Sequence, residues 1–135
     1  MLHMLDTDTA SYIIKGRSPH IEAKLAELSP SMLCVSVITR AELLYGLKRL
    51  PAEHHLHLAV RRFLKIMRVL AWDSDAANFY ADIRHQLLSS GQPIGELDMM
   101  IAAHSLAVGA ALVTNNVQHF KRIQLPLVLV NWVDA

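Results

Sequence analysis

The chain has 135 residues, a formal net charge of +1 and a composition that is 53% hydrophobic. That length suits one compact domain over residues 1–135 with a sizeable core. A charge so close to zero neither requires nor excludes a nucleic-acid partner. The single cysteine, Cys34, excludes a disulfide framework within one chain, and no apolar run reaches the roughly 18–20 residues of a membrane span. We therefore expect a soluble, cytoplasmic protein without a signal peptide or a membrane segment.

Short apolar runs alternate with helical segments along the chain. The apolar runs predict five strands, at about residues 1–5, 32–37, 69–72, 110–114 and 127–130. Periodicity and capping residues predict helices at about residues 9–15, 18–28, 40–50, 51–68, 74–89 and 97–108. This alternation is typical of an α/β fold with a central, mostly parallel sheet that is covered on both faces. The helices between about residues 39 and 68 are expected to form an arm.

Three carboxylates stand where polar side chains are unexpected. Asp6 directly follows the first predicted strand, Glu42 comes one turn after the second, and Asp98 begins the helix that precedes the fourth. Right-handed β-α-β connections bring Asp6 and Glu42 to the same edge of the sheet, where ligands bind in open α/β folds. Pattern alone puts Asp98 at the opposite edge, unless its helix is tilted.

Each acid also has a purely structural interpretation. Thr39 and Glu42 fit a capping box, Asp98 suits the first turn of a helix, and Asp6 or Asp8 fits the cap of the helix that follows. The apolar residues that flank Glu42 and Asp98 nevertheless indicate largely buried helix surfaces. Buried carboxylates require hydrogen bonds, a countercharge or a metal ion. A hard cation such as Mg²⁺, which binds oxygen ligands, meets that requirement.

Four segments in order along the chain resemble the PIN-domain ribonucleases, and specifically the VapC-type toxins of bacterial toxin–antitoxin pairs. The segments are residues 4–8, 36–46, 91–102 and 112–116, the last followed by Phe120. Together they cover nearly the full length. The resemblance implies a three-layer α/β/α sandwich around a mostly parallel sheet of about five strands.

The resemblance also implies a site. Asp6, Glu42 and Asp98 correspond to the family's acidic residues, and they are the expected ligands of Mg²⁺ or Mn²⁺. Asn116, with Asn115 as the alternative, stands where the family often has a fourth acid. An amide supplies no charge at this position. It would bind the metal ion through its carbonyl oxygen or through a water molecule, or it would contact the RNA.

The function implied by the resemblance is that of a toxin, a metal-dependent endoribonuclease that hydrolyses RNA phosphodiesters. The implied substrate is tRNA, cut in the anticodon stem-loop, with initiator tRNA as one candidate. The implied partners are a VapB-like antitoxin, a second copy in a homodimer, a larger toxin–antitoxin assembly, and operator DNA bound through the antitoxin. Basic side chains are candidate phosphate contacts: Lys15, Arg17, Arg40, Lys48, Arg49, Arg61, Arg62, Lys65, Arg84, Lys121 and Arg122.

Two other functions stay open from the residues. The run Asp6-Thr7-Asp8-Thr9 matches the signature of haloacid-dehalogenase-like phosphatases, in which Asp6 would be the nucleophile and Asp8 the general acid. That fold expects paired acids after a late strand, where this chain has Asn115 and Asn116. The second of these functions is that of an inert PIN-like interaction module. Its only support is the amide at the position of the fourth acid.

Overall fold

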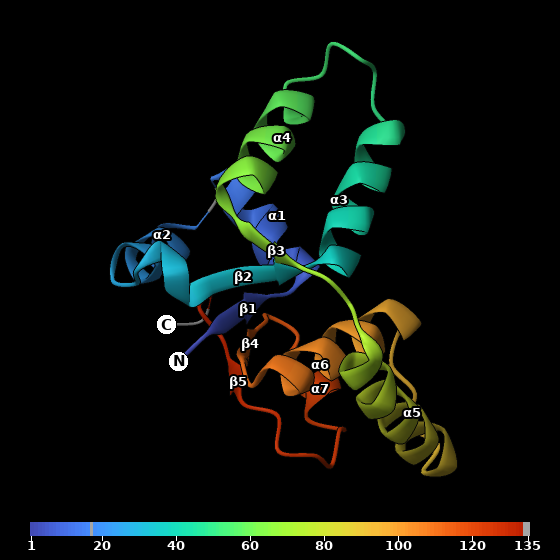
Figure 1. Ribbon diagram of the computed structural model, residues 1–135. Helices are drawn as coiled ribbons and strands as arrows, with labels where there is room; N and C mark the ends of the chain where they lie inside the picture. Colours follow the sequence, from blue (N-terminus) through green and yellow to red (C-terminus); the bar gives the residue numbers. More distant parts are fainter. Residues whose placement is uncertain (17, 134–135) are drawn as a thin grey trace.

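The computed structural model describes residues 1–16 and 18–133. Its centre is one five-stranded sheet in which each pair of neighbours is parallel, in the order β3-β2-β1-β4-β5 (Figure 1). The strands are β1 (His3–Leu5), β2 (Leu33–Ser36), β3 (Arg68–Leu70), β4 (Ala111–Val113) and β5 (Leu129–Val130). The predicted α/β class and parallel sheet are confirmed. Arg17, one of the predicted phosphate contacts, lies outside the described residues.

Successive residues of the central strands point to opposite faces of the sheet, as the pleat requires. Met4 pairs with Cys34 and Leu112, and these side chains belong to one core cluster. The next residue, Leu5, pairs with Val35 and Val113, and these belong to another. A strand with both faces buried reads as a continuous apolar run, which is why the strands could be predicted from short unbroken runs.

Helices cover both faces and produce three layers (Figure 1). One face packs against α5, α6 and α7, and the other against α1, α2 and part of α4. The described helices are α1 (Thr7–Lys15), α2 (Pro19–Ala26), α3 (Val37–Lys48), α4 (Leu56–Ile66), α5 (Ser74–Ser89), α6 (Glu96–Val108) and α7 (Val117–Phe120), with a short 3₁₀ turn at Pro30–Met32. Within the described residues, none of the helices is long and apolar enough to cross a membrane.

Helices α3 and α4 form a hairpin that extends beyond the sheet (Figure 1). The side chains of Leu43 and Leu47 from α3 pack with Val60 and Leu64 from α4, and Ala10 of α1 closes the same cluster. This cluster lies beside the carboxyl edge of the sheet. It therefore fixes the direction in which α3 leaves β2, and so the position of Glu42.

Several predicted helix boundaries are wrong. In each case, hydrogen bonds near the helix end determine where the helix begins. The helix predicted from about residue 40 begins at Val37, because Ser36 Oγ accepts a hydrogen bond from the Ile38 N–H at 3.1 Å and is the N-cap. The helix predicted from about residue 51 begins at Leu56. Residues 51–54 form a turn instead, in which the His54 N–H donates to the Pro51 carbonyl at 3.0 Å.

Two further differences concern the second half of the chain. The N-cap of α5 is Asp73, which accepts a hydrogen bond from the Ala76 N–H at 3.1 Å, and not Ser74. The short helix α7 was not predicted, because four residues are too few to show a helical period. Phe120, the last residue of α7, is 1% exposed, so burial of one aromatic side chain anchors this turn.

Candidate active site

Asp6 lies at the carboxyl end of β1 and is only 3% exposed. One of its oxygens, Oδ1, accepts a hydrogen bond from the Thr9 N–H at 2.8 Å, so Asp6 is the N-cap of α1. Burial raises the pKa of Asp6, and hydrogen bonds from Thr114 and Thr9 oppose this effect. The predicted cap is therefore confirmed, and it leaves carboxylate capacity for another ligand.

Glu42 points from α3 toward the start of α1. Thr7 Oγ1 donates a hydrogen bond to Glu42 Oε1 at 2.6 Å, and Thr7 and Thr39 share a second one at 3.0 Å. A hydroxyl has one proton to give, so Thr39 donates to Thr7, which donates to Glu42. The capping box predicted for Thr39 and Glu42 is wrong, because Ser36 caps α3 and Thr39 is a fully buried residue inside the helix.

Asp98 is the third residue of α6, and its electrostatic environment shows which groups surround it. Burial raises the pKa of Asp98 to about 6, with further contributions from the negative charges of Asp6, Glu42 and Asp8. These interactions require that the start of α6 lies at the same edge of the sheet as Asp6 and Glu42. The structure thus brings together the three predicted acids, including the one whose placement the sequence left open.

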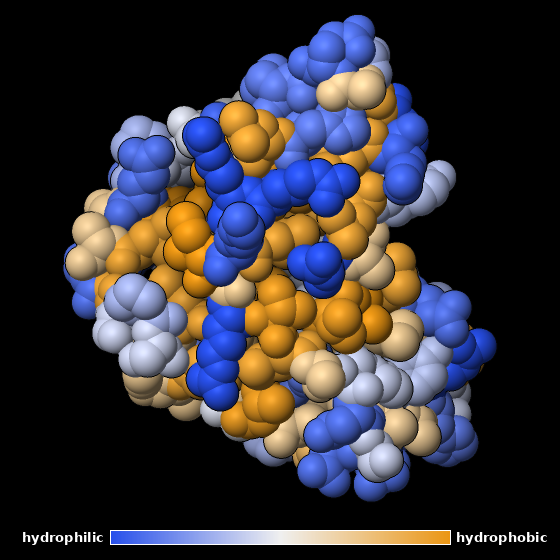
Figure 2. All heavy atoms as spheres, turned by 45° about the horizontal axis from the view of Figure 1, so that its top comes forward, coloured by the Kyte–Doolittle hydropathy of each residue, from blue (hydrophilic) through white to orange (hydrophobic). Residues whose placement is uncertain are grey.

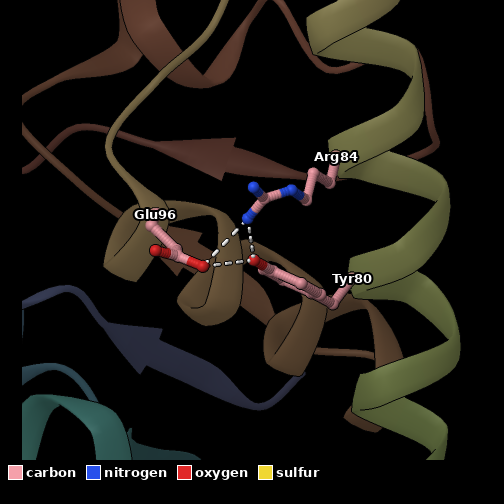
Figure 3. A network of polar contacts seen from close by, with 3 residues as sticks. All are labelled: Tyr80, Arg84 and Glu96. Carbon is pink, nitrogen blue, oxygen red and sulfur yellow. Dashed lines mark hydrogen bonds and ion pairs between the residues drawn. The ribbon is translucent and has the colours of Figure 1, made fainter.

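Two polar networks hold α6 in this place. Arg84 Nη1 donates to Tyr80 Oη at 2.8 Å and to Glu96 Oε1 at 2.9 Å, and Tyr80 Oη donates to the same Glu96 oxygen at 2.8 Å (Figure 3). This network joins α5 to the first turn of α6. Arg84 is therefore engaged with a carboxylate, which argues against its predicted role as a phosphate contact.

The second network is buried. His104 Nδ1 and Ser36 Oγ are 2.7 Å apart, and both residues are at most 1% exposed. This hydrogen bond connects α6, which carries Asp98, to the N-cap of α3, which carries Glu42. Burial lowers the pKa of His104, which favours the neutral imidazole at this position. His104 is therefore a packed histidine.

The two asparagines after β4 occupy different places. Asn115 is exposed and lines a shallow pocket with Asp8, Ser11 and neighbouring residues of α1. Asn116 is half-buried, and its Nδ2 lies 2.7 Å from His119 Nδ1. The His119 imidazole is close enough to Asp98 to lower its pKa. Each amide therefore neighbours a residue that affects the pKa of Asp98, and Asn116 is the one that contacts its neighbour through a hydrogen bond.

Three residues that complete this arrangement were not predicted as site residues: Thr7, Thr114 and His119. The hydroxyls of Thr7 and Thr114 hold Glu42 and Asp6 from neighbouring elements. A polar residue at the end of a parallel strand is itself a signal, and both threonines carry it. His119 carries no such signal, because it lies in a four-residue helix that the pattern does not reveal.

The acids meet the requirements of a Mg²⁺ site in charge and in donor type. Within residues 1–16 and 18–133, no three His, Cys, Asp or Glu side chains are arranged to hold a metal ion by themselves. Mg²⁺ commonly takes only one or two carboxylates and completes its shell with water and substrate phosphate. Burial and then the negative charges of Asp6, Glu42 and Asp8 raise the pKa of Asp98, and a bound divalent cation would offset that negative charge.

Comparison with known proteins agrees with this arrangement. Residues 3–125 match the model of the PIN domain family. The chain is 38% identical to the tRNA(fMet)-specific endonuclease VapC of Salmonella typhimurium over 120 residues, covering 89% of this chain and 90% of that protein. It is 35% identical to the ribonuclease VapC2 of Haemophilus influenzae over 131 residues, covering 97% and 98% of the two chains.

The fold agrees equally well with a solved structure. A chain in the crystal structure of VapBC2 from Rickettsia felis, bound to a DNA fragment from its promoter, superposes with a TM-score of 0.89. It is 31% identical, and the match covers 98% of this chain and 99% of that one. The family match, the two relatives and this structural similarity each cover about nine tenths of the chain or more. The chain therefore belongs to the PIN domain family and, within it, to the VapC group.

Proposed function

We propose that this protein is the toxin of a toxin–antitoxin pair and that it is a metal-dependent endoribonuclease. The observation that supports the proposal is that Asp6 and Glu42 lie at the carboxyl edge of the sheet, close enough to Asp98 for their charges to add to the burial that raises its pKa. Relatives that share a third or more of the sequence are named as ribonucleases.

The site would hold Mg²⁺, or Mn²⁺, through Asp6 and Asp98, with Glu42 as a further ligand or as the residue that orients water. When bound, the ion would polarise the phosphoryl oxygen and lower the pKa of the attacking water. Hydrolysis joins the water oxygen to phosphorus, breaks one phosphorus–oxygen ester bond and gives a proton to the leaving oxygen. Phosphodiester hydrolysis thus requires no covalent intermediate on the protein.

The protein's own contribution is to keep its carboxylates in fixed positions. Asp6 is held through Oδ1 by the Thr9 N–H, and Glu42 is held through Oε1 by Thr7. The second oxygen of Glu42, Oε2, remains to accept a hydrogen bond from water. Fixed orientation of this kind contributes to rate because the reacting groups need no rearrangement in the transition state.

The proposed substrate is tRNA, with cleavage in the anticodon stem-loop of initiator tRNA as the first candidate. The relative from Salmonella typhimurium is named for specificity toward tRNA(fMet), which is the basis for this choice. Single-stranded loops expose unstacked bases and an accessible backbone, whereas the grooves of a duplex hide them. A groove of about 340 Å³ beside Glu42, between α1, α3 and α4, leads away from the acidic site.

The proposed partners are a VapB-like antitoxin, which covers the acidic cleft, and a second copy of the chain. Operator DNA would bind to the larger assembly through the antitoxin; the similar Rickettsia felis structure is a VapBC complex with promoter DNA. Apolar side chains gather across the face shown in Figure 2, interrupted by hydrophilic ones. An apolar groove of about 280 Å³ between α1, α2 and α4, next to the 82%-exposed Ile66, offers an area for such a partner.

The phosphatase alternative loses its support in the structure. Asp8 is exposed on α1 and lines a pocket with Asn115, and β4 ends in a threonine and two amides instead of paired acids. The match to the PIN domain family accounts for the same acids without a phosphoryl-enzyme. The inert module differs from the nuclease only in activity, so an assay separates the two.

The decisive assay is cleavage of folded bulk tRNA by antitoxin-free protein. Wild-type protein is tested with Mg²⁺ and with EDTA, and the Asp98→Asn variant is tested with Mg²⁺. We expect discrete fragments only from wild-type protein with Mg²⁺. Equal cutting in all three reactions would indicate a contaminating nuclease, and no cutting of any RNA by correctly folded protein would favour the inert module.

A further inference from the structure

The groove of about 340 Å³ between α1, α3 and α4, here called the Glu42 groove, begins at the acidic site. Thr7 and Glu42 line one end of it, and the 2.6 Å hydrogen bond between them makes that end part of the site. A neighbouring pocket shares Ile14, Lys15 and Leu56 with the groove, so the hollow continues beyond its far end. The Glu42 groove therefore suits an extended chain better than a small molecule.

The far end of the Glu42 groove carries positive charge. Lys15 is in the last turn of α1 and Arg49 is the C-cap of α3, and both exposed side chains line the groove. Among residues 1–16 and 18–133, neither belongs to an ion pair of 4.0 Å or less. A cation near a helix C-terminus complements the helix dipole. Lys48 meets that requirement for α3 without lining the groove, so the dipole alone does not explain Arg49.

The length of the helices separates the two cations from the acidic end of the groove. Lys15 comes eight residues after Thr7 and Arg49 seven after Glu42, which at about 1.5 Å per residue is about 12 Å and about 10 Å along the helix axes. A stacked strand advances about 3.4 Å per nucleotide, so a phosphate at the cations lies about three nucleotides from one at the acids. The cations therefore fit a phosphate that flanks the scissile one.

Gly46 lies on the wall of the groove between the acidic and the basic end. It follows Glu42 by four residues and precedes Arg49 by three, so all three lie on one face of α3. A glycine inside a helix lowers stability relative to alanine. Gly46 has no positive φ, and no atom beyond its own part of the helix lies within 4 Å of the place of a Cβ. Neither backbone conformation nor packing thus requires glycine here, and its effect is to keep the groove open along α3.

We propose that the Glu42 groove binds the RNA backbone beside the scissile phosphate. Lys15 and Arg49 contact flanking phosphates, and Gly46 leaves room for the strand to pass between them and the acidic end. An RNA backbone is the occupant that this charge favours, because each nucleotide brings one negative charge. The buried floor of Leu47 and Val60 offers no hydrogen bonds to base edges, so the contact positions the strand without reading its sequence. The proposal rests on the proposed nuclease function.

The salt dependence of RNA binding tests the two cations. In the Asp98→Asn background, Lys15→Gln with Arg49→Gln is titrated with a short poly(U) strand over a range of salt concentrations. The matched control is Lys24→Gln with Lys48→Gln, which removes two exposed cations from the last turns of α2 and α3. Each lost contact with a single strand reduces the slope of log affinity against log salt by about 0.7, so we expect a loss of about 1.4 for the first variant and none for the control. Equal slopes in the two variants would overturn the proposal.

Gly46 is tested by filling the groove. In the same Asp98→Asn background, Gly46→Leu should lower the affinity for the strand at least about tenfold, because the new side chain occupies the space of the RNA. Gly46→Ala should raise the urea midpoint and change RNA affinity little. Ala41→Leu enlarges an exposed position of α3 outside the groove and should bind RNA like its parent. A folded Gly46→Leu protein with unchanged RNA affinity would refute passage of the strand, and if this variant does not fold, the salt slopes decide.

Both tests measure binding, so they can fail separately from the nuclease assignment. If wild-type protein cuts no RNA but the Lys15 and Arg49 substitutions reduce the salt slope, the nuclease function fails and the binding groove stands. If wild-type protein cuts RNA and the groove variants bind like their controls, the nuclease function stands and the binding groove is refuted. Weaker binding of a protein partner with unchanged RNA binding would assign the groove to that partner, and absence of any RNA binding by the Asp98→Asn protein would also overturn the proposal.

Discussion

At the residue scale, the dominant feature is a gathering of carboxylates that, among residues 1–16 and 18–133, belong to no ion pair of 4.0 Å or less. Asp6 is almost fully buried, and the pKa of Asp98 is raised to about 6 by burial and by the neighbouring carboxylates. Folding therefore forces like charges together, which costs stability whenever Asp98 is ionised. Sites of this kind are typically functional, because a purely structural site would not retain such a cost.

Removing the Asp98 charge should therefore stabilise the protein. A pKa raised from 3.8 to about 6 means that ionised Asp98 lowers the free energy of unfolding by at most about 3 kcal/mol. Partial solvent exposure of Asp98 reduces this cost to about 1–2 kcal/mol. We expect Asp98→Asn to gain that amount at pH 7 in urea unfolding. The gain is complete above about pH 6 and disappears below about pH 4, where Asp98 is protonated in both the folded and the unfolded states. A constant gain across this range would mean that charge is not the cause.

Bound Mg²⁺ should stabilise the wild-type protein, as removal of the Asp98 charge does. If Asp6 and Asp98 hold the ion, millimolar Mg²⁺ raises the Tm of wild-type protein because the ion binds only the folded state. The same addition should leave the Tm of Asp98→Asn nearly unchanged. Ca²⁺ and Na⁺ at matched ionic strength control for screening. Equal shifts in both proteins would refute Asp98 as a ligand.

Thr7 provides a test of how Glu42 is held. Thr7→Val removes the 2.6 Å hydrogen bond to Glu42 while the side-chain shape is preserved. We expect kcat to fall about ten- to a hundredfold, since a hydrogen bond to a charged group contributes about 1.5–3 kcal/mol, while RNA binding by the variant stays close to wild type. Thr7→Ser, which retains the hydroxyl, should restore most of the activity, and failure to do so would contradict the assignment.

At the element scale, the site depends on the relation between α3 and α6. Neither helix was placed correctly by pattern alone. Helix α3 begins three residues earlier than predicted. The start of α6 lies at the carboxyl edge of the sheet, whereas pattern alone put it at the opposite edge. The buried hydrogen bond between His104 and Ser36 ties them together at 2.7 Å. Loss of a buried hydrogen bond of this kind leaves one polar group without a partner.

The His104 contact predicts a specific pH dependence of stability. Burial lowers the pKa of His104 below 6.5, so the unfolded state takes up a proton more readily than the folded state. Stability should therefore fall as the pH drops below about 6.5. In the Asp98→Asn background, where the opposite contribution of Asp98 is absent, we expect the urea midpoint to decrease from pH 7.5 to pH 5.5. His104→Gln in the same background should flatten this slope, and an unchanged slope would assign it to another group.

At the scale of the whole molecule, basic side chains are gathered on the α3–α4 hairpin although the net charge is only +1. Arg40, Arg61 and Lys65 line a groove of about 240 Å³ together with Leu44 and Leu64, and no acidic residue lines it. Among the described residues, none of these three cations belongs to an ion pair of 4.0 Å or less. The groove lies on a different face of α3 from Glu42, so we expect only an RNA large enough to pass around this helix, such as a folded tRNA, to reach it.

The salt dependence of RNA binding tests this arrangement. In the inactive Asp98→Asn background, Arg61→Gln with Lys65→Gln is compared with Lys24→Gln plus Arg68→Gln, which removes two exposed charges that lie on α2 and β3. Each lost phosphate contact reduces the slope of log affinity against log salt by about 0.7–0.9. We expect the groove variant to lose about 1.5 of this slope and to bind tRNA more weakly than the control. Equal slopes in the two variants would show that RNA does not use the groove.

The amino-acid sequence by itself determined the alternation of strands and helices, the parallel sheet and the position of Asp6 at a strand end. These features are local, because run length, helical period and strand-end polarity depend on residues a few positions apart. Predicted helix boundaries were less accurate where two nearby residues could each be the N-cap. At the start of α3, Ser36 is the N-cap and Thr39 is not.

Only the tertiary structure decided how the site is assembled. The meeting of Asp98 with Asp6 depends on the packing of α6 against α5 and the sheet, and the contact between Thr7 and Glu42 joins residues 35 positions apart. The pairing of Asn116 with His119 depends on a short helix held by one buried phenylalanine. Contacts between distant residues follow from how whole elements pack, and no periodicity within one element records them.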